Sequence, residues 1–409
     1  MPDPTRVRYL DKTTPPHLST LILLAGVAAL GMNVFLPSLP GMTAYFETDY
    51  GIMQLSVALY LGCNAIMQLF VGPISDRYGR RPVMLWGIVI FMAATVGCLM
   101  APTVEVFLAF RMVQATIVVG MVLSRAIVRD LVSQDRAASM LGYLTMGMSV
   151  VPMIGPAIGG VLDDAFGWRA NFWLLLLLGG ALFALAWADL GETAPMENTR
   201  FRDQVRDYPA LLTSPRFWGY NLAATFSSGA FFAYLGGAPY VGAEVFGMSP
   251  SVLGVYFGAP AIGYFLGNWI SGRFSIRFGV NTMILAGALL CSGGMLALFM
   301  LFMVGVGSPV LFFGFMTFVG LGNGMVIPNA TSGMLSVRPK LAGTASGLGG
   351  AMMLGGGATL SAVAGIALGS GSSALPLIAI MAATSLAGVF AILFVLRREA
   401  QLARAAPAE

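Results

Sequence analysis

The chain has 409 residues, of which 57% are hydrophobic and only 10% are charged. A soluble protein carries about 25% charged residues, so this composition excludes an ordinary soluble domain and indicates a chain that lies mostly within a membrane. The net charge of +4 comes from basic residues in tails and loops, which favours contact with anionic lipid over nucleic acid.

Apolar segments long enough to cross a bilayer recur from residue 18 onward, and each requires about 20 mostly apolar residues. The sequence predicts an all-α membrane protein with twelve transmembrane helices in two six-helix pseudo-repeats. The predicted parts are a tail at 1–17, an N-terminal bundle at 18–188, a linker at 189–216, a C-terminal bundle at 217–396 and a tail at 397–409. The predicted spans are 18–40, 52–72, 83–101, 105–128, 137–162, 169–188, 217–242, 250–272, 281–304, 309–331, 341–367 and 374–396.

Basic residues gather in the two tails and in every second gap between the predicted spans. The other gaps hold only Arg169, at the start of a span, and Arg111 alone lies deep inside a span. The positive-inside rule places the basic loops in the cytoplasm. An even number of spans puts both termini on one side of the membrane, so we expect both tails and the linker to be cytoplasmic.

The loop after the second span reads Gly72-Pro-Ile-Ser-Asp76-Arg77-Tyr-Gly79-Arg80-Arg81-Pro82. Glycines permit a tight turn between helices, and an acid can accept hydrogen bonds from nearby arginines or from a helix N-terminus. The loop recurs after the eighth span with Ile276 in place of the acid. The matching pairs, 200 residues apart, are Gly72 and Gly272, Ser75 and Ser275, Arg77 and Arg277, and Gly79 and Gly279.

Further motifs follow in the fourth and fifth spans. They are Arg111-Met-Val-Gln114, Ser124-Arg125-Ala-Ile-Val-Arg129-Asp130 and Gly155-Pro156-Ala-Ile-Gly159-Gly160. Together with Phe35-Leu36-Pro37, Gly167-Trp168-Arg169, Glu192-Thr193 and the glycine loop, they resemble the major facilitator superfamily. The similarity is most specific to the bicyclomycin-resistance branch of the drug–proton antiporters.

This resemblance implies a monomeric, multi-pass transporter of the bacterial inner membrane that exports small amphipathic compounds. The proton gradient would drive it, no cofactor would be needed, and the two halves would rock about a site near the midplane. A conformational latch would comprise Gly72, Asp76, Arg77, Gly79, Arg80, Arg129 and Asp130. Gly155, Pro156, Gly159 and Gly160 would form the helix that is typical of antiporters.

Asn33 is the main departure from that branch, in which an aspartate usually stands at this position as a candidate proton carrier. An amide cannot titrate, and every acid of the chain lies in a tail, a loop or the end of a span. The coupling group therefore stays open. Residues expected to reach a substrate cavity, or instead to bridge helices, are Asn33, Asn64, Arg111, Gln114, Tyr234, Tyr256, Tyr264, Asn268, Asn323 and Asn329.

Arg111 is the one charge that the sequence places inside the membrane, where an arginine costs about 2.5–3.5 kcal/mol on insertion scales. It could bind an anionic substrate, be held by amides such as Asn33 and Gln114, or extend to the membrane interface. A carrier of an anionic solute is therefore the alternative to a drug exporter.

A receptor, a scaffold and a membrane enzyme fit the sequence less well than a transporter. No nucleophile–base pair, metal cluster or phosphate loop is evident, and the three cysteines show no paired spacing that would indicate a disulfide or zinc site.

Overall fold

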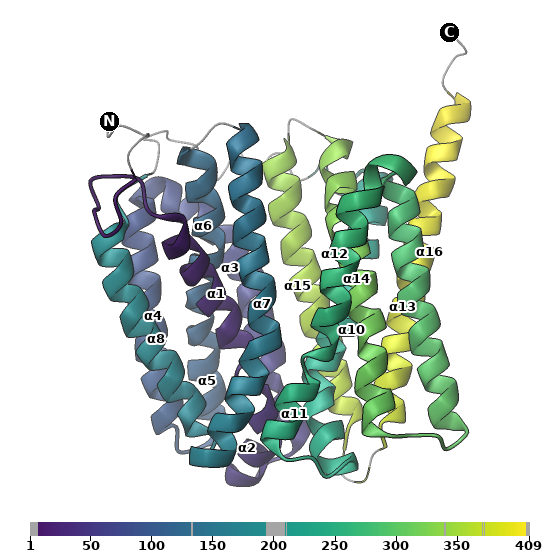
Figure 1. Ribbon diagram of the computed structural model, residues 1–409, viewed down its shortest axis with the longest axis horizontal. Helices are drawn as coiled ribbons and strands as arrows, with labels where there is room; N and C mark the ends of the chain where they lie inside the picture. The colour runs from purple at the N-terminus through teal and green to yellow at the C-terminus, as the bar shows by residue number, and fades with distance from the viewer. Residues whose placement is uncertain are drawn as a thin grey trace. The chain divides into compact units, whose positions relative to one another are not determined.

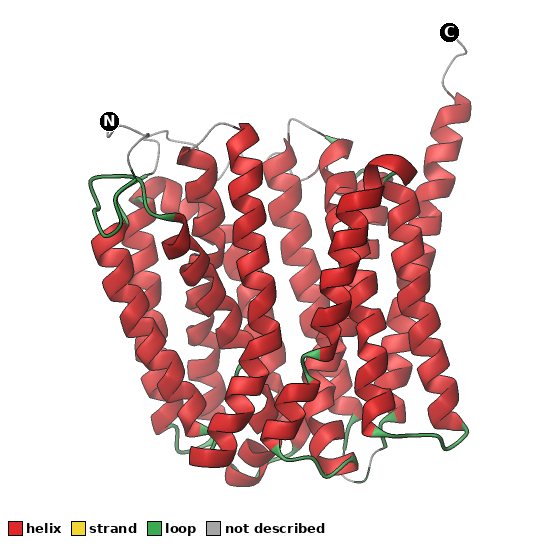
Figure 2. Cartoon of the chain, viewed as in Figure 1, coloured by secondary structure: helices red, strands yellow, loops and turns green. Residues whose placement is uncertain are grey.

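The computed structural model describes residues 7–131, 134–193, 209, 211–338, 341–369, 371 and 373–405. Every regular element in this part is helical (Figure 2), which confirms the predicted all-α class. Nine of the described helices are long and apolar enough to cross a membrane. Three further long helices, α7 (Gln134–Phe166), α10 (Pro215–Tyr240) and α12 (Ala259–Phe278), occupy predicted spans.

Two compact units divide the chain, and unit 1 combines Met1–Phe201 with the short stretch Ser249–Val255. Within unit 1, α1 packs against α6, α7 and α8, and α4 packs against α5 and α8 (Figure 1). Besides α7, the helices of this unit are α1 (Leu18–Asn33), η1 (Leu36–Ser38), α2 (Leu39–Tyr45), α3 (Tyr50–Tyr78), α4 (Arg80–Met100), α5 (Val104–Gln114), η2 (Ala115–Ile117), α6 (Val118–Leu131) and α8 (Arg169–Asp189). The short helix α11 (Pro250–Tyr256) also belongs to it, except for its last residue, Tyr256.

Two predicted spans of unit 1 are interrupted helices. The first, 18–40, ends as an α-helix at Asn33, and prolines then open η1 and α2, because proline suits the first turn of a helix but not its interior. The fourth span, 105–128, is divided by η2 into α5 and α6.

Unit 2 combines Arg202–Met248 with Tyr256–Glu409, and α14 packs against α10, α12, α13 and α15 within it. The predicted span 250–272 is not continuous, because Phe257 and Gly258 separate α11 from α12. The last helix runs to Ala405, so the predicted tail at 397 begins as helix. The remaining elements are η3 (Val241–Val245), α13 (Val280–Met303), α14 (Pro309–Val337), α15 (Ala342–Ala367) and α16 (Leu375–Ala405).

Large apolar side chains lie on the outside of both units, including Trp86, Leu177 and Phe265, which are 66%, 70% and 71% exposed. Polar side chains such as Asn33, Arg111 and Asn323 are buried instead. This distribution suits a chain surrounded by lipid, where an apolar surface costs nothing and polar groups need partners inside the protein.

Candidate functional site

The turn between α3 and α4 consists of Gly79 alone. Its φ of +94° is readily adopted only by glycine. A Cβ at this position would also lie 2.3 Å from Oε2 of Glu192. Gly79 is therefore required both by the backbone and by the carboxylate packed against it.

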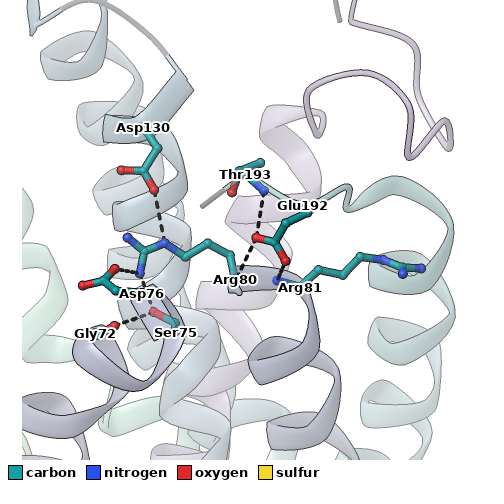
Figure 3. A network of polar contacts seen from close by, with 8 residues as sticks. All are labelled: Gly72, Ser75, Asp76, Arg80, Arg81, Asp130, Glu192 and Thr193. Atoms are coloured by element: carbon teal, nitrogen blue, oxygen red, sulfur yellow. Dashed lines mark hydrogen bonds and ion pairs between the residues drawn. The ribbon is translucent and has the colours of Figure 1, made fainter. Parts of the chain in front are cut away.

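Arg80, the first residue of α4, is buried between two acids (Figure 3). Its Nη1 lies 2.6 Å from Oδ1 of Asp76, and its Nε lies 3.1 Å from Oδ2 of Asp130. Nη1 also donates to the Ser75 hydroxyl, which in turn donates to the Gly72 carbonyl at 2.7 Å. One guanidinium thus joins α3, α4 and α6, and removing it would leave two acids facing each other.

Glu192, which follows the end of α8, also belongs to this network. The sequence motifs did not predict a role for it there. Its carboxylate accepts hydrogen bonds from the backbone N–H groups of Arg80 at 2.8 Å and Arg81 at 3.3 Å (Figure 3). These are among the N–H groups that a helix leaves without an internal partner. A negative charge at a helix N-terminus is favourable, so Glu192 caps α4 from outside the helix.

The described partners of Arg80 all belong to unit 1. The resemblance implied a latch between the two halves, and what the structure brings together is an acid–arginine–acid network inside one half. Arg77, another predicted latch residue near this turn, stacks over the Tyr78 ring at 5.3 Å. The side chain of Arg129 lies outside the described residues.

The antiporter-type helix α7 makes close contacts on two sides. A Cβ at Gly159 would lie 1.7 Å from the carbonyl oxygen of Val34, beyond the end of α1, and one at Gly160 would lie 2.1 Å from that of Pro250 in α11. Gly155 faces Leu30 of α1. Hence these glycines permit contacts between helix backbones, and α7 remains helical through Pro156.

Arg111 is 1% exposed and is held by uncharged groups. Its Nη2 donates to the Gly31 carbonyl at 2.7 Å, and its Nε donates to the Ser56 carbonyl at 3.3 Å. The rings of Phe35 and Tyr60 lie 4.3 and 4.0 Å from the guanidinium carbon. Carbonyl dipoles and aromatic faces therefore balance this charge, and no acid among the described residues pairs with it.

Of the two amides predicted to hold Arg111, only Gln114 does so. Its Oε1 accepts a hydrogen bond from Nη1 of Arg111, and its Nε2 donates to the Thr95 hydroxyl at 2.8 Å. Asn33 instead donates to the Ala29 carbonyl of its own helix at 3.0 Å. Its Oδ1 is buried without a hydrogen-bond partner among the described residues. Since Arg111 is enclosed by α1, α3 and α5, it does not extend to the surface of unit 1.

Most of the other predicted cavity residues lie in unit 2, where two of them bridge helices. Asn323 accepts from the Ser227 hydroxyl at 2.8 Å, and Asn329 donates to the Ser271 hydroxyl at 2.7 Å. Asn268 bonds within its own helix, to the Tyr264 carbonyl at 2.8 Å.

Two tyrosines of the predicted set lie in an aromatic cluster of unit 2. The Tyr234 ring lies 4.9 Å from that of Phe257, and the Tyr256 ring lies 5.2 Å from that of Phe313. Tyr234 is fully buried, with its hydroxyl unpartnered among the described residues. In unit 1, Asn64 on α3 is buried as well.

Comparisons with known proteins agree with this architecture. The profile of the Major Facilitator Superfamily matches residues 21–360 and 239–409. Multidrug resistance protein D of Escherichia coli (strain K12) is 33% identical over 358 residues, which are 85% of this chain and 88% of that protein. A bicyclomycin resistance protein homolog of Haemophilus influenzae is 28% identical over 393 residues, which are 95% and 98% of the two chains.

A solved D-xylose–proton symporter has a similar fold, with a TM-score of 0.71 at 17% identity over 92% of this chain and 96% of that chain. The sequence-based resemblance is thus confirmed, and the chain is a transporter rather than an enzyme. The profile match, the identity to curated relatives and the helical architecture together show that the chain belongs to the Major Facilitator Superfamily of multi-pass membrane transporters.

Proposed function

We propose that this transporter exports small amphipathic compounds across the inner membrane of a bacterium, with both termini in the cytoplasm. The observation that carries the proposal is the similarity to proteins named for multidrug and bicyclomycin resistance over most of their length. The proton gradient drives export, and the two halves alternate by rocking about a central site. The basic loops and tails support the orientation.

In this proposal the network around Arg80 is the part of the cytoplasmic latch that unit 1 contributes. The close contacts of Asp76 and Asp130 with that arginine support the assignment. Asp76→Asn is expected to lower transport far more than protein abundance, since the substitution removes an ion pair while keeping the shape of the side chain. Near-normal transport at equal expression would remove the latch from the proposal.

Export and its coupling are tested together in proteoliposomes that contain the purified protein and a pH-sensitive dye. Adding a lipophilic cationic substrate on one side should change the internal pH, in proportion to the amount of protein. Liposomes that contain the Asp76→Asn variant are the matched control. A substrate flux without any pH change would contradict proton coupling but leave export intact.

Asn33 allows a sharper test of coupling. Asn33→Asp would place a titratable group at a buried position, where desolvation favours the neutral acid at ordinary pH. If coupling requires an acid here, this variant should acquire a steeper pH dependence of transport than the wild-type chain. A wild-type protein that depends steeply on the proton gradient, and does not respond to the substitution, would place the coupling group elsewhere.

A second candidate function, transport of an anionic solute, is suggested by Arg111, with which no acid among the described residues pairs. Under this reading Arg111→Lys weakens binding, because a lysine ammonium does not reproduce the planar fork of a guanidinium. Arg111→Ala would then reduce the binding of anionic substrates while sparing neutral and cationic ones. Equal losses for all substrate charges in competition binding would reject this function.

A further inference from the structure

A groove of about 390 Å³ runs along the outside of unit 1, between α3, α4 and the start of α6. Its walls are almost entirely apolar, and Tyr78 and Trp86 in them are 62% and 66% exposed. Because these helices span a membrane, the medium that reaches the groove is lipid.

The groove begins at the Gly79 turn, where Tyr78 ends α3 and Pro82 lies in the first turn of α4. Its deepest residue on α3 is Met67, eleven residues before Tyr78. At 1.5 Å per residue this is a depth of about 16 Å, or about half of a 30 Å hydrocarbon core. The groove is therefore one leaflet deep, as an acyl chain requires.

The end of the groove at the Gly79 turn carries positive charge. Arg77 is exposed, its guanidinium lies 5.3 Å from the centroid of the Tyr78 ring, and no acid among the described residues pairs with it. The neighbouring acid, Asp76, is paired with Arg80. The mouth thus offers an arginine at the depth where lipid headgroups lie.

We propose that this groove binds an acyl chain of an anionic phospholipid, with the lipid phosphate at Arg77. Apolar walls hold the chain, and charge complementarity at the mouth selects the anionic headgroup over a zwitterionic one. The proposal requires only that the chain spans a membrane, so it does not depend on what the protein transports.

Trp86 supplies a probe inside the groove. In a variant that keeps this tryptophan and replaces the others by phenylalanine, brominated acyl chains should quench its fluorescence on contact. Brominated phosphatidylglycerol should bind about fivefold more tightly than brominated phosphatidylcholine, the factor expected for one arginine at an anionic surface. Arg77→Gln should abolish this preference.

The second unit provides matched controls. Trp269 on α12 is 61% exposed, and Arg277 stacks over Phe278 at 5.3 Å just as Arg77 stacks over Tyr78. A variant with Trp269 as its sole tryptophan should show no such preference, and Arg277→Gln should leave the preference at Trp86 unchanged. Equal quenching by the two lipids at Trp86, the same preference at Trp269, or a preference that survives Arg77→Gln would each overturn the proposal.

Native mass spectrometry repeats the test without removing tryptophans. Phosphatidylglycerol should remain bound to the otherwise unaltered protein and to Arg277→Gln, and be lost from Arg77→Gln. Val83→Phe, which fills the groove from α4, should reduce binding of the lipid at least fivefold. Retention of the lipid by both Arg77→Gln and Val83→Phe would place it elsewhere.

Discussion

In each unit, a buried or partly buried acid joins helices of that unit by hydrogen bonds. The two units make these contacts at corresponding places but with different residues. In unit 1, Asp189 at the end of α8 accepts hydrogen bonds from the backbone N–H of His17 at 2.9 Å and from the Thr20 hydroxyl at 2.6 Å. In unit 2, Glu399 on the last helix accepts from the Tyr220 hydroxyl at 2.9 Å and from Asn281 at 2.5 Å.

The partners of these acids follow the repeat of the sequence. Thr20 and Tyr220 stand 200 residues apart, as do Arg81, whose backbone binds Glu192, and Asn281, whose side chain binds Glu399. In unit 1, Asp189 binds the start of the first span and Glu192 binds the start of the third. In unit 2, the single acid Glu399 binds the starts of both corresponding spans. The two repeats therefore form these hydrogen bonds at matching positions but with different side chains.

Among the residues that the structure describes, only unit 1 adds a buried arginine to this arrangement. The positions that match Asp76 and Arg80 hold Ile276 and Val280, and Ile276 is 97% exposed. In unit 1, α5 in the fourth span carries Arg111, whereas α14, in the corresponding span of unit 2, contains no basic residue. In the described part of the chain, the buried arginines thus lie in unit 1, whereas unit 2 is held by hydrogen bonds and one partly exposed ion pair.

Loss of Arg80 should have the largest effect. Arg80→Ala leaves Asp76 and Asp130 without their shared cation, and breaking such a buried pair costs about 3 kcal/mol. The control, Arg77→Ala, removes an exposed arginine from the same turn and should cost less than about 1 kcal/mol. Thermal unfolding of the purified variants in detergent measures both, and equal losses would show that the network adds little stability.

Asp189→Asn should rank second. The acid is fully buried, and its Oδ1 accepts from the Leu10 N–H at 2.7 Å while Oδ2 binds His17 and Thr20. In the variant, the amide N–H group would point at one of these donors, and that donor would lose its acceptor. Such a loss costs about 2 kcal/mol. Asp11→Asn, at a partly exposed position on the same segment, is the control. Limited proteolysis should detect release of residues 7–17 only in the first variant.

Glu399→Gln should have a smaller effect than Asp189→Asn. The carboxylate and its partner Arg216 are 31% and 32% exposed, and such an ion pair contributes less than about 1 kcal/mol. Arg397→Gln, a charge change at an exposed position on the same helix, serves as the control. If Glu399→Gln destabilises the protein as much as Asp189→Asn, the contacts of the two acids contribute equally to stability. The expected difference between the units would then be wrong.

The sequence predicted the helical class and a turn between the second and third spans, because both depend on local patterns. The predicted loop at 72–82 was too long, since all of it except Gly79 is helical. Runs of apolar residues indicate spans, and a glycine between helices indicates a turn. The break at Phe257 and Gly258 was missed because the residues around it are apolar, and hydropathy does not register an interruption inside such a segment. The available signal was Pro260, since proline suits the first turn of a helix.

The candidate site was predicted less completely than the fold, for a physical reason. Asp76 and Arg80 are four residues apart, on either side of the Gly79 turn, so this local turn brings them together. Glu192 reaches Arg80 across 112 residues, and Asp189 reaches His17 across 172. Contacts of this kind depend on tertiary packing, and the only signal in the sequence was an acid at or after the end of the sixth span.

The smallest expected effect comes from restoring the missing charges in unit 2. Ile276→Asp combined with Val280→Arg recreates the spacing of Asp76 and Arg80. Because position 276 is almost fully exposed, water screens the new pair, and it should add no more than about 0.5 kcal/mol. A double-mutant cycle with the two single variants isolates the interaction in thermal unfolding. A gain as large as the loss in Arg80→Ala would mean that the pair alone stabilises a unit. A gain near zero would show that burial and the second acid, Asp130, give the network of unit 1 its strength.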